Sequence, residues 1–344
     1  GEVDDRPVTE MLRLLRAGAI RPPPMGLLFL FMVLYILAVG PLDYFILKKH
    51  NLLKWSACTF LGLAVVFSVS AWYVSFHLFA GASKMNRVTF VDVLPQPGDA
   101  PDRVIVQDFA GHYAPTGAKL DLVPEGETTH VSDFADPGSY VGGGGLQRSP
   151  VELAFASPAR ATGRLLIPFR SLRTTRTLVN RSATVPLDIT VEEDGGRITV
   201  RNGLDFVLRD VSLIRGVRPV DIGDLDPGEE AIVSPSAGYL RHESIENLIA
   251  WTRDEPSRSD LLATGRRLLS LSWAGAARPH ERQTDPEWSE HFRHLAKMGI
   301  DRSPAILEGA TIIVAWTDAR DPFGLGGGDS EGFSMTFLRK VVQP

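Results

Sequence analysis

The sequence predicts a membrane-anchored α+β protein. A two-helix transmembrane hairpin precedes all-β, immunoglobulin-like sandwich domains, with a helical insertion before the last strands. Two long uncharged segments near the N-terminus predict the hairpin, because helices of that length and composition are typical of membrane spans. Short alternating segments separated by Gly, Pro and Asp predict the strands that follow. The single cysteine, Cys58, excludes an intrachain disulfide and a multi-cysteine metal site.

Charge is distributed unevenly along the 344 residues, although 36 basic and 41 acidic side chains bring the formal net charge to only −5. Residues 1–83 hold 7 basic and 5 acidic side chains, which leaves 29 basic and 36 acidic side chains in residues 84–344. Nucleic-acid binding depends on clustered Lys and Arg side chains that displace counterions. The mildly acidic C-terminal part therefore argues against a nucleic-acid partner.

The two uncharged segments run from Met25 to Leu42 and from Trp55 to Ala80. A helix rises about 1.5 Å per residue and needs about 20 apolar residues to cross a hydrocarbon core of about 30 Å. Both segments approach or exceed that length, whereas the alternative, a pair of buried core helices, is typically shorter and carries a polar stripe. The sequence therefore predicts a juxtamembrane segment, a first span, a short loop and a second span over residues 1–24, 25–48, 49–54 and 55–82.

The short loop forces the two spans into an antiparallel hairpin, with the flanking segments on one side of the membrane. Three lysines within residues 48–54 favour a cytoplasmic loop, whereas five basic side chains in the flanks favour the reverse orientation. A long following domain is translocated largely regardless of its charge, so we give the loop more weight. We expect an integral protein of the bacterial cytoplasmic membrane whose C-terminal domain is extracytoplasmic.

Residues 9–20 predict a short helix ahead of the first span. Its apolar side chains Met11, Leu12, Leu15 and Ala19 share one face, and Pro22 stops the helix. This helix is expected either to lie on the membrane surface or to be the tail of an upstream domain.

Asp43 is the only acidic residue at the depth of the membrane. Carboxylates in such positions are costly and often belong to ion or proton paths. The favoured alternative is an interfacial turn, because Gly40 and Pro41 kink the helix or end its regular part. At such a turn the carboxylate reaches water or pairs with Lys48 or Lys49.

Beyond residue 83 the apolar period changes from helical to alternating. A first β domain is expected over residues 84–184, with strands that end at Gly, Pro or Asp clusters. These strands are predicted at residues 87–94, 103–108, 119–123, 151–155 and 164–169. Residues 136–150 form a glycine-rich loop that lacks the spacing of a dinucleotide-binding fingerprint.

An immunoglobulin-like β unit is expected over residues 185–235. The turn Asp194-Gly195-Gly196 predicts a hairpin, because glycine adopts positive φ at little cost. Residues 236–300 return to helical spacing, and residues 301–344 supply two closing strands. The strands are predicted at residues 186–193, 197–201, 206–215, 230–233, 310–316 and 332–342, and the helices at residues 244–253, 259–270 and 285–298.

The sequence contains no nucleophile elbow, zinc-binding helix motif or phosphate-binding loop, and we predict no catalytic residue, cofactor or metal site. One predicted helix carries potential zinc ligands, but a solvated polar face is favoured. These ligands are Glu287, Glu290, His291 and His294. Residues 324–329 partly resemble a calcium-binding repeat, but a single copy is more typical of a hairpin loop.

Arginines form the densest basic stretch of the chain. They could contact phosphate headgroups or an acidic partner, whereas ordinary solvated strand charges are the favoured interpretation. Alternation along a strand does not place all of them on one face. The stretch contains Arg164, Arg170, Arg173, Arg176 and Arg181.

Residues 40–49 read GPLDYFILKK and, with a second span directly behind them, resemble a motif in uncharacterised bacterial membrane-anchored proteins. The positions of this membrane motif that we single out are Gly40, Pro41, Asp43, Tyr44, Lys48 and Lys49. Residues 223–229 and 313–318 are similar to a turn and a closing strand in the immunoglobulin-like domains of those proteins. The resemblance implies placement in the bacterial envelope and offers no catalytic residue.

These features together predict a non-enzymatic, membrane-anchored envelope protein. Its β-sandwich region is expected to bind a protein partner or to support a transport or secretion assembly, and the lipid bilayer is the other expected partner. The alternative is an envelope hydrolase or carbohydrate-binding enzyme that acts through clustered carboxylates such as Asp318 and Asp321.

Overall fold

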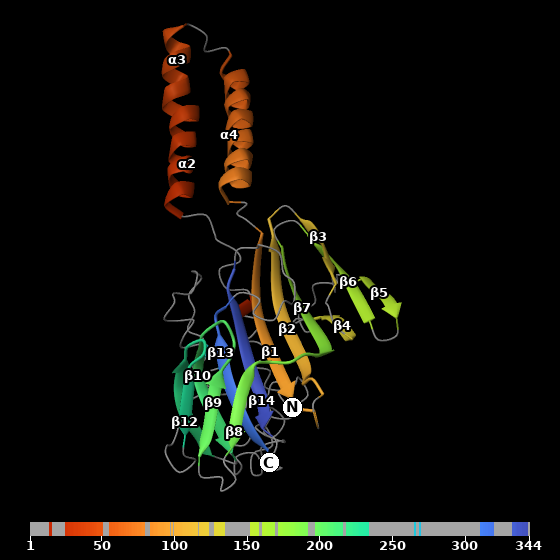
Figure 1. Ribbon diagram of the computed structural model, residues 1–344. Helices are drawn as coiled ribbons and strands as arrows, with labels where there is room; N and C mark the ends of the chain where they lie inside the picture. The colour runs from red at the N-terminus through yellow and green to blue at the C-terminus, as the bar shows by residue number, and fades with distance from the viewer. Residues whose placement is uncertain are drawn as a thin grey trace, which may run out of the picture. The chain divides into compact units, whose positions relative to one another are not determined.

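The computed structural model divides into two compact units. One is Ile20–Ala82, which holds the helical hairpin, and the other combines Gly1–Ala19 with Ser83–Pro344, which hold the strands (Figure 1). The structure describes residues 14–15, 25–50, 55–79, 83–96, 98, 100–115, 117–123, 127–134, 152–157, 160–168, 171–191, 197–215, 218–233, 265, 268–269, 310–319 and 332–342.

The helical unit is an antiparallel pair of long helices (Figure 1). Its first helix is continuous through three segments, and its second is α4. The segments are α2 (Met25–Leu37), the π-helical turn η1 (Ala38–Leu42), α3 (Asp43–Lys49) and α4 (Ser56–Phe79). Two stretches, Phe29–Lys49 and Ser56–Tyr73, are long and apolar enough to cross a membrane. The predicted pair of apolar helices is therefore confirmed.

Strands dominate the second unit, and they form two sheets. The larger sheet has the strand order β11-β10-β13-β14-β1-β2-β7-β4-β6-β3, with β5 also paired to β6. Its strands are β1 (Lys84–Leu94), β2 (Arg103–Ala114), β3 (Ala118–Leu122), β4 (Thr128–Asp133), β5 (Glu152–Ser157), β6 (Arg160–Ile167), β7 (Ser171–Ser182), β10 (Leu208–Arg215), β11 (Arg218–Leu225), β13 (Thr311–Thr317) and β14 (Ser334–Val342). The smaller sheet has the order β12-β9-β8, from β8 (Leu187–Val191), β9 (Ile198–Asn202) and β12 (Glu230–Val233).

The closing strand β14 joins parts of the chain that are far apart in the sequence. It pairs antiparallel with β13 and parallel with β1, where Phe337 lies opposite Phe90. Strands from residues 84–184 and from residues 185–344 therefore belong to one sheet. The coarse prediction, apolar helices followed by a mostly β region, is confirmed.

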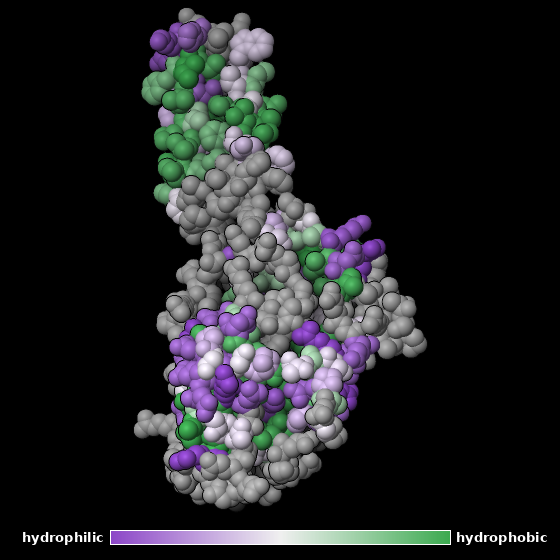
Figure 2. Space-filling model, in the orientation of Figure 1, coloured by the Kyte–Doolittle hydropathy of each residue, from purple (hydrophilic) through white to green (hydrophobic). Residues whose placement is uncertain are grey.

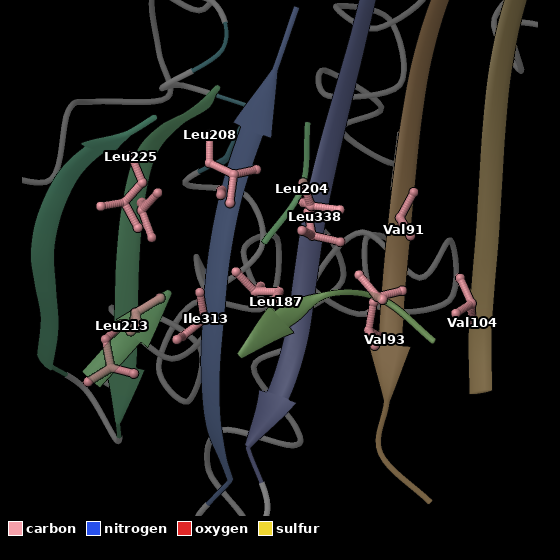
Figure 3. Packing of buried hydrophobic residues seen from close by; sticks show 14 of the residues in the cluster. Val91, Val93, Val104, Leu187, Leu204, Leu208, Leu213, Leu225, Ile313 and Leu338 are labelled. Atoms are coloured by element: carbon pink, nitrogen blue, oxygen red, sulfur yellow. The ribbon is translucent and has the colours of Figure 1, made fainter. Parts of the chain in front are cut away.

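One face of the large sheet packs against the small sheet, and the main hydrophobic core fills the space between them (Figure 3). The large sheet contributes alternate residues such as Val91 and Val93 of β1, while the small sheet contributes Leu187, Ile198 and Val200. This alternation buries every second side chain of each strand on the core side. The two sheets therefore share one hydrophobic core in this part of the unit.

Aromatic side chains occupy the opposite face of the large sheet. The rings of Phe90 and Phe337 stack with centroids 5.0 Å apart, and Phe109 meets Phe90 edge-on at 6.2 Å. Phe134 packs against Phe109 at 5.0 Å. All three of Phe90, Phe109 and Phe337 are fully buried, so both faces of the sheet carry core.

Leu14 and Leu15 are helical and completely buried, and Leu15 lies on this aromatic face. The Nδ2 group of Asn86 donates a hydrogen bond to the Leu15 backbone carbonyl at 3.0 Å. A Cβ atom at Gly111 would lie 2.5 Å from the same oxygen, so glycine there permits the close approach. These two leucines belong to the β unit, which differs from the expectation of a helix lying on the membrane surface. Burial of the two leucines removes apolar surface from water, which stabilises the folded β unit.

The strand predictions hold for most of the described residues. β12 has the predicted bounds, and β1, β8, β9, β10, β13 and β14 begin or end within a few residues of them. Three strands without a matching prediction are β4, β7 and β11. In the predicted helix over residues 259–270, Gly265, Leu268 and Leu269 are helical and the two leucines are buried, while the helices predicted at residues 244–253 and 285–298 lie outside the described residues.

Candidate functional site

The two helices of the hairpin meet through aromatic side chains and one polar pair. Phe31 and Tyr35 of α2 both contact Phe67 of α4 edge-on, with ring centroids 5.4 and 5.2 Å apart. Further along, the Thr59 hydroxyl donates to the Asp43 carboxylate, with 3.2 Å between Oγ1 and Oδ2. Leu47 then closes the contact near the loop and is only 5% exposed.

The π-turn sets which side chains face α4. In an uninterrupted α-helix, positions seven and eleven residues after Tyr35 would share its face, and these are Leu42 and Ile46. Both are instead more than half exposed, at 58% and 52%. The π-turn inserts one residue, which rotates the following helix by about 100°. That rotation turns Asp43 and Leu47 toward α4.

Pro41 accounts for the position of this turn, because proline lacks the N–H that an α-helix needs. The N–H of Asp43 bonds to the Ala38 carbonyl, five residues back, in the π pattern. The interruption that Gly40 and Pro41 predict is therefore confirmed. What the structure adds is that the helix continues through the interruption with a changed phase.

The remaining positions of the membrane motif lie on the outside of the hairpin. Gly40, Pro41, Tyr44, Lys48 and Lys49 are exposed. The Lys48 ammonium lies over the Tyr44 ring, 5.6 Å from its centroid. The structure thus places the Lys48 ammonium over the Tyr44 ring, whereas the Asp43 carboxylate accepts a hydrogen bond from Thr59.

Apolar side chains cover the outer surface of the hairpin (Figure 2). Phe29, Phe45 and Leu61 are each about two-thirds exposed, at 68%, 67% and 66%. Trp55 lies at the loop end of α4, and Trp72 and Tyr73 lie seventeen residues or more further along. Such aromatic residues are typical of the two interfaces of a membrane.

The predicted basic stretch does not form one surface. Arg164 on β6 is exposed and pairs with Asp121 at 2.8 Å. Arg173 and Arg176 are three apart on β7 and therefore project from opposite faces of the sheet. Arg176 lies over the Phe109 ring and donates to Gln107, and burial lowers the pKa of its guanidinium. Arg170 lies outside the described residues.

Buried ion pairs connect the central strands and were not foreseen from the sequence. Arg339 of β14 binds Asp92 of β1 through two contacts, at 2.7 and 2.9 Å, with both side chains almost fully buried. On the other face, Arg87 lies 3.2 Å from Asp108, which also accepts a hydrogen bond from Thr89 at 2.8 Å. Each charge is compensated within the fold, so these pairs have a structural role.

His112 is a buried histidine at the end of β2. Its Nε2 lies 3.0 Å from the Thr175 hydroxyl on the neighbouring strand. Burial, with a smaller effect of the Arg87 charge, lowers the pKa of His112 to about 4. The imidazole is therefore neutral at physiological pH.

A bulge in β10 creates a polar cluster around Trp316. Asp210 has a φ of 48°, in the left-handed region that L-residues rarely adopt. Its carboxylate accepts a hydrogen bond from the Trp316 indole at 2.7 Å, and its own N–H donates to Asp224 at 2.8 Å. Arg209 lies over the indole and pairs with Asp318 at 3.2 Å. These contacts explain why the strained residue and the bulge persist.

The carboxylates that the hydrolase hypothesis invokes are not shown together. Asp318 binds Arg209, and Asp321 lies outside the described residues. The zinc candidates on the predicted helix and the loop over residues 324–329 also lie outside the described part. Within that part, no group of three or more His, Cys, Asp or Glu side chains could hold a metal ion.

Comparisons with known proteins concern mainly the β unit. Residues 184–343 match a family model described as a domain of unknown function (DUF8725), a part that contains β8 to β14. No curated protein matches the chain. A solved structure of the yeast delta-COP-I mu-homology domain, complexed with a Dsl1 WxWxV peptide, is similar at a TM-score of 0.34 and 9% identity, over 76% of this chain and 98% of that chain. A second structure of the yeast delta-COP-I mu-homology domain has a TM-score of 0.30, with the same identity and coverage.

Proposed function

We propose that this chain is a non-enzymatic, membrane-anchored protein of the bacterial envelope. In this proposal the hairpin spans the cytoplasmic membrane, and the β unit lies on the extracytoplasmic side. There it binds a protein partner or supports a transport or secretion assembly.

The exposed apolar surface of the hairpin carries the proposal. In water, side chains such as Phe29, Phe45 and Leu61 would leave a large contiguous apolar surface exposed, which soluble proteins avoid. A bilayer removes this surface from water, while both helices satisfy their backbone hydrogen bonds internally. The aromatic residues near each end of α4 fit the same arrangement.

The packing of the β unit supports a hairpin rather than a single crossing. Leu15 precedes the first helix and Asn86 follows the second, yet the two residues are hydrogen-bonded in one unit. Two segments that fold together must lie on the same side of a membrane. An even number of crossings, here two, satisfies this requirement.

Extraction of membranes tests the anchor. We expect the full chain to remain in the membrane pellet after alkaline carbonate treatment and to float with lipid vesicles. Lysine placed at the exposed positions Leu34 and Val65 together should release it, because charge in the hydrocarbon core is costly. Val123→Lys, at an exposed position of the β unit, is the matched control and should change nothing. Complete extraction of the parent chain would contradict the anchor.

Site-directed labelling tests the orientation. In a Cys58→Ser background, Asp226→Cys places one thiol on an exposed turn of the β unit, and Asn51→Cys places one in the sequence between the two predicted spans. We expect a membrane-impermeant maleimide to label position 226 in intact spheroplasts and position 51 only after lysis. The reverse pattern would place the β unit in the cytoplasm.

Purification in mild detergent tests the partner. We expect a second protein to be recovered with the full chain at fixed stoichiometry. Recovery of the chain alone, under conditions that keep it folded, counts against a stable partner and leaves the anchor unaffected.

A further inference from the structure

We propose that the Asp43 carboxylate binds a cationic side chain on a transmembrane helix of another membrane protein, so that the hairpin is one component of an intramembrane complex. This inference rests on the proposed membrane anchoring and extends it to a specific contact inside the membrane.

Asp43 lies deeper than the side chains that mark the interface at the loop end. It precedes Lys49 by six residues, which is about 9 Å along a helix axis. Its neighbour Thr59 follows Trp55 by four residues, or about 6 Å, and indole rings favour the interface. A charge at this depth is separated from bulk water and requires a compensating group.

Among the described residues, the hydrogen-bond donor to Asp43 is a neutral hydroxyl that also has a second acceptor. The Thr59 hydroxyl lies 3.2 Å from Asp43 Oδ2 but also 3.0 Å from the Ser56 carbonyl, and its single hydrogen serves one acceptor at a time. Lys48, the cation nearest in the sequence, lies over the Tyr44 ring. Among the described residues, no Lys or Arg pairs with Asp43, so the hairpin there supplies no cation to this carboxylate.

The surface beside Asp43 allows a helix to approach closely. Gly40, three residues earlier on the same helix, is exposed, and no atom lies within 4 Å of the place where its Cβ would be. Small residues at such positions let helix backbones come close together in lipid. Asp43 itself is half-buried, so the residue is not enclosed by the hairpin.

A second copy of this chain does not provide the missing charge. Residues 25–47 and 55–79 contain no Lys or Arg. A second hairpin in the same orientation would therefore bring another carboxylate to the same depth, and two like charges repel. A Lys or Arg side chain of a different protein supplies the opposite charge together with several N–H donors.

Co-reconstitution with synthetic transmembrane peptides tests the contact. Each peptide is a polyleucine helix of about 20 residues, with either Lys or Leu placed about 9 Å from one interface, at the depth of Asp43. Association with the full chain is measured by energy transfer in lipid vesicles. We expect the Lys peptide to bind about tenfold more tightly than the Leu peptide. Asp43→Asn should remove this preference, whereas Asp226→Asn in the β unit should retain it.

Equal association of both peptides with the parent chain, or an unchanged preference in Asp43→Asn, would overturn the inference. Self-association that depends on Asp43 would overturn it too, because the carboxylate would then serve a second copy. Flotation of the same vesicles separates these outcomes from a failure of anchoring. A chain that floats with the lipid but shows no preference keeps its anchor and loses only the proposed contact.

Discussion

The side-chain amide of Asn86 donates a hydrogen bond to the backbone carbonyl of Leu15 at 3.0 Å, across 71 residues that include the whole helical hairpin. The chain thus leaves the β unit, forms both helices and returns to a position beside its point of departure. Gly111 on the neighbouring strand lies against the same carbonyl. This junction holds the N-terminal segment to the aromatic face of the large sheet.

Gly111→Ala should therefore weaken the junction. Its Cβ would lie 2.5 Å from the Leu15 carbonyl oxygen, so the N-terminal segment has to move and partly expose two buried leucines. We expect a loss of about 1–3 kcal/mol in the free energy of unfolding of the β unit. Urea unfolding of the full chain in detergent, followed by near-UV circular dichroism, measures the loss. Gly62→Ala, where no atom lies within 4 Å, is the matched control, and equal stabilities of the two variants would contradict the close packing.

Pro41→Ala should change the side chain that faces α4. Alanine restores the N–H that proline lacks, so we expect the chain to continue as a regular α-helix without the π-turn. The helix after the turn then rotates back by about 100°, so that Leu42 replaces Asp43 opposite Thr59. Cysteine pairs in a Cys58→Ser background report this change through a short thiol crosslinker. We expect the pair at positions 43 and 59 to crosslink in the parent hairpin, and the pair at positions 42 and 59 to crosslink in Pro41→Ala. The same pattern in both chains would show that Pro41 does not set the phase.

Elements whose signals are local could be predicted from the sequence. The apolar helices follow from composition, and β12 follows from the turn at Asp226 and Gly228 with the alternating residues behind it. β7 lacks a matching prediction because its Arg and Thr side chains do not alternate with apolar ones, although neighbouring strands half-bury them. β11 contains Pro219 and Gly223, which indicate turns but are tolerated in a strand at the sheet edge.

Contacts between distant residues could not be predicted in the same way. Gly40 and Pro41 indicate an interruption, but the helix phase after it depends on how many residues the turn inserts. The partner of Asp43 depends on the register of two helices, which places Thr59 beside it and Lys48 elsewhere. Arg339 and Asp92 meet only because β14 pairs in parallel with β1, and no local pattern specifies that pairing.

Stability should fall in mildly acidic solution because of His112. Its pKa is about 4 in the folded chain and 6.5 in the unfolded chain, so the unfolded chain binds the proton first as the pH falls. The contribution of neutral His112 to the free energy of unfolding is fully present above pH 6.5. It is lost as the pH falls toward 4, and the total loss is at most about 3 kcal/mol. His112→Gln, which keeps a hydrogen-bonding group near Thr175, should flatten this dependence. Denaturant unfolding between pH 7.5 and 4.5 measures it, and parallel curves for the two chains would contradict the assignment.

Removal of only one partner of the Arg339–Asp92 pair should strongly lower the stability of the β unit. Arg339→Met leaves the Asp92 carboxylate buried without its cation, and removal of one partner from such a pair costs about 3–5 kcal/mol of stability. Replacement of both residues, as Asp92→Leu with Arg339→Met, removes the uncompensated charge and should recover most of that loss.

A double-mutant cycle of denaturant unfolding measures the coupling between the two side chains. Arg164 and Asp121 form the matched control, because that ion pair is exposed and its coupling should be below about 1 kcal/mol. A coupling for Arg339 and Asp92 as small as that of the control would mean that the buried pair does not hold β14 to β1. A large coupling, in contrast, fits a role in register, since a shift of β14 by one residue would turn Arg339 to the opposite face of the sheet.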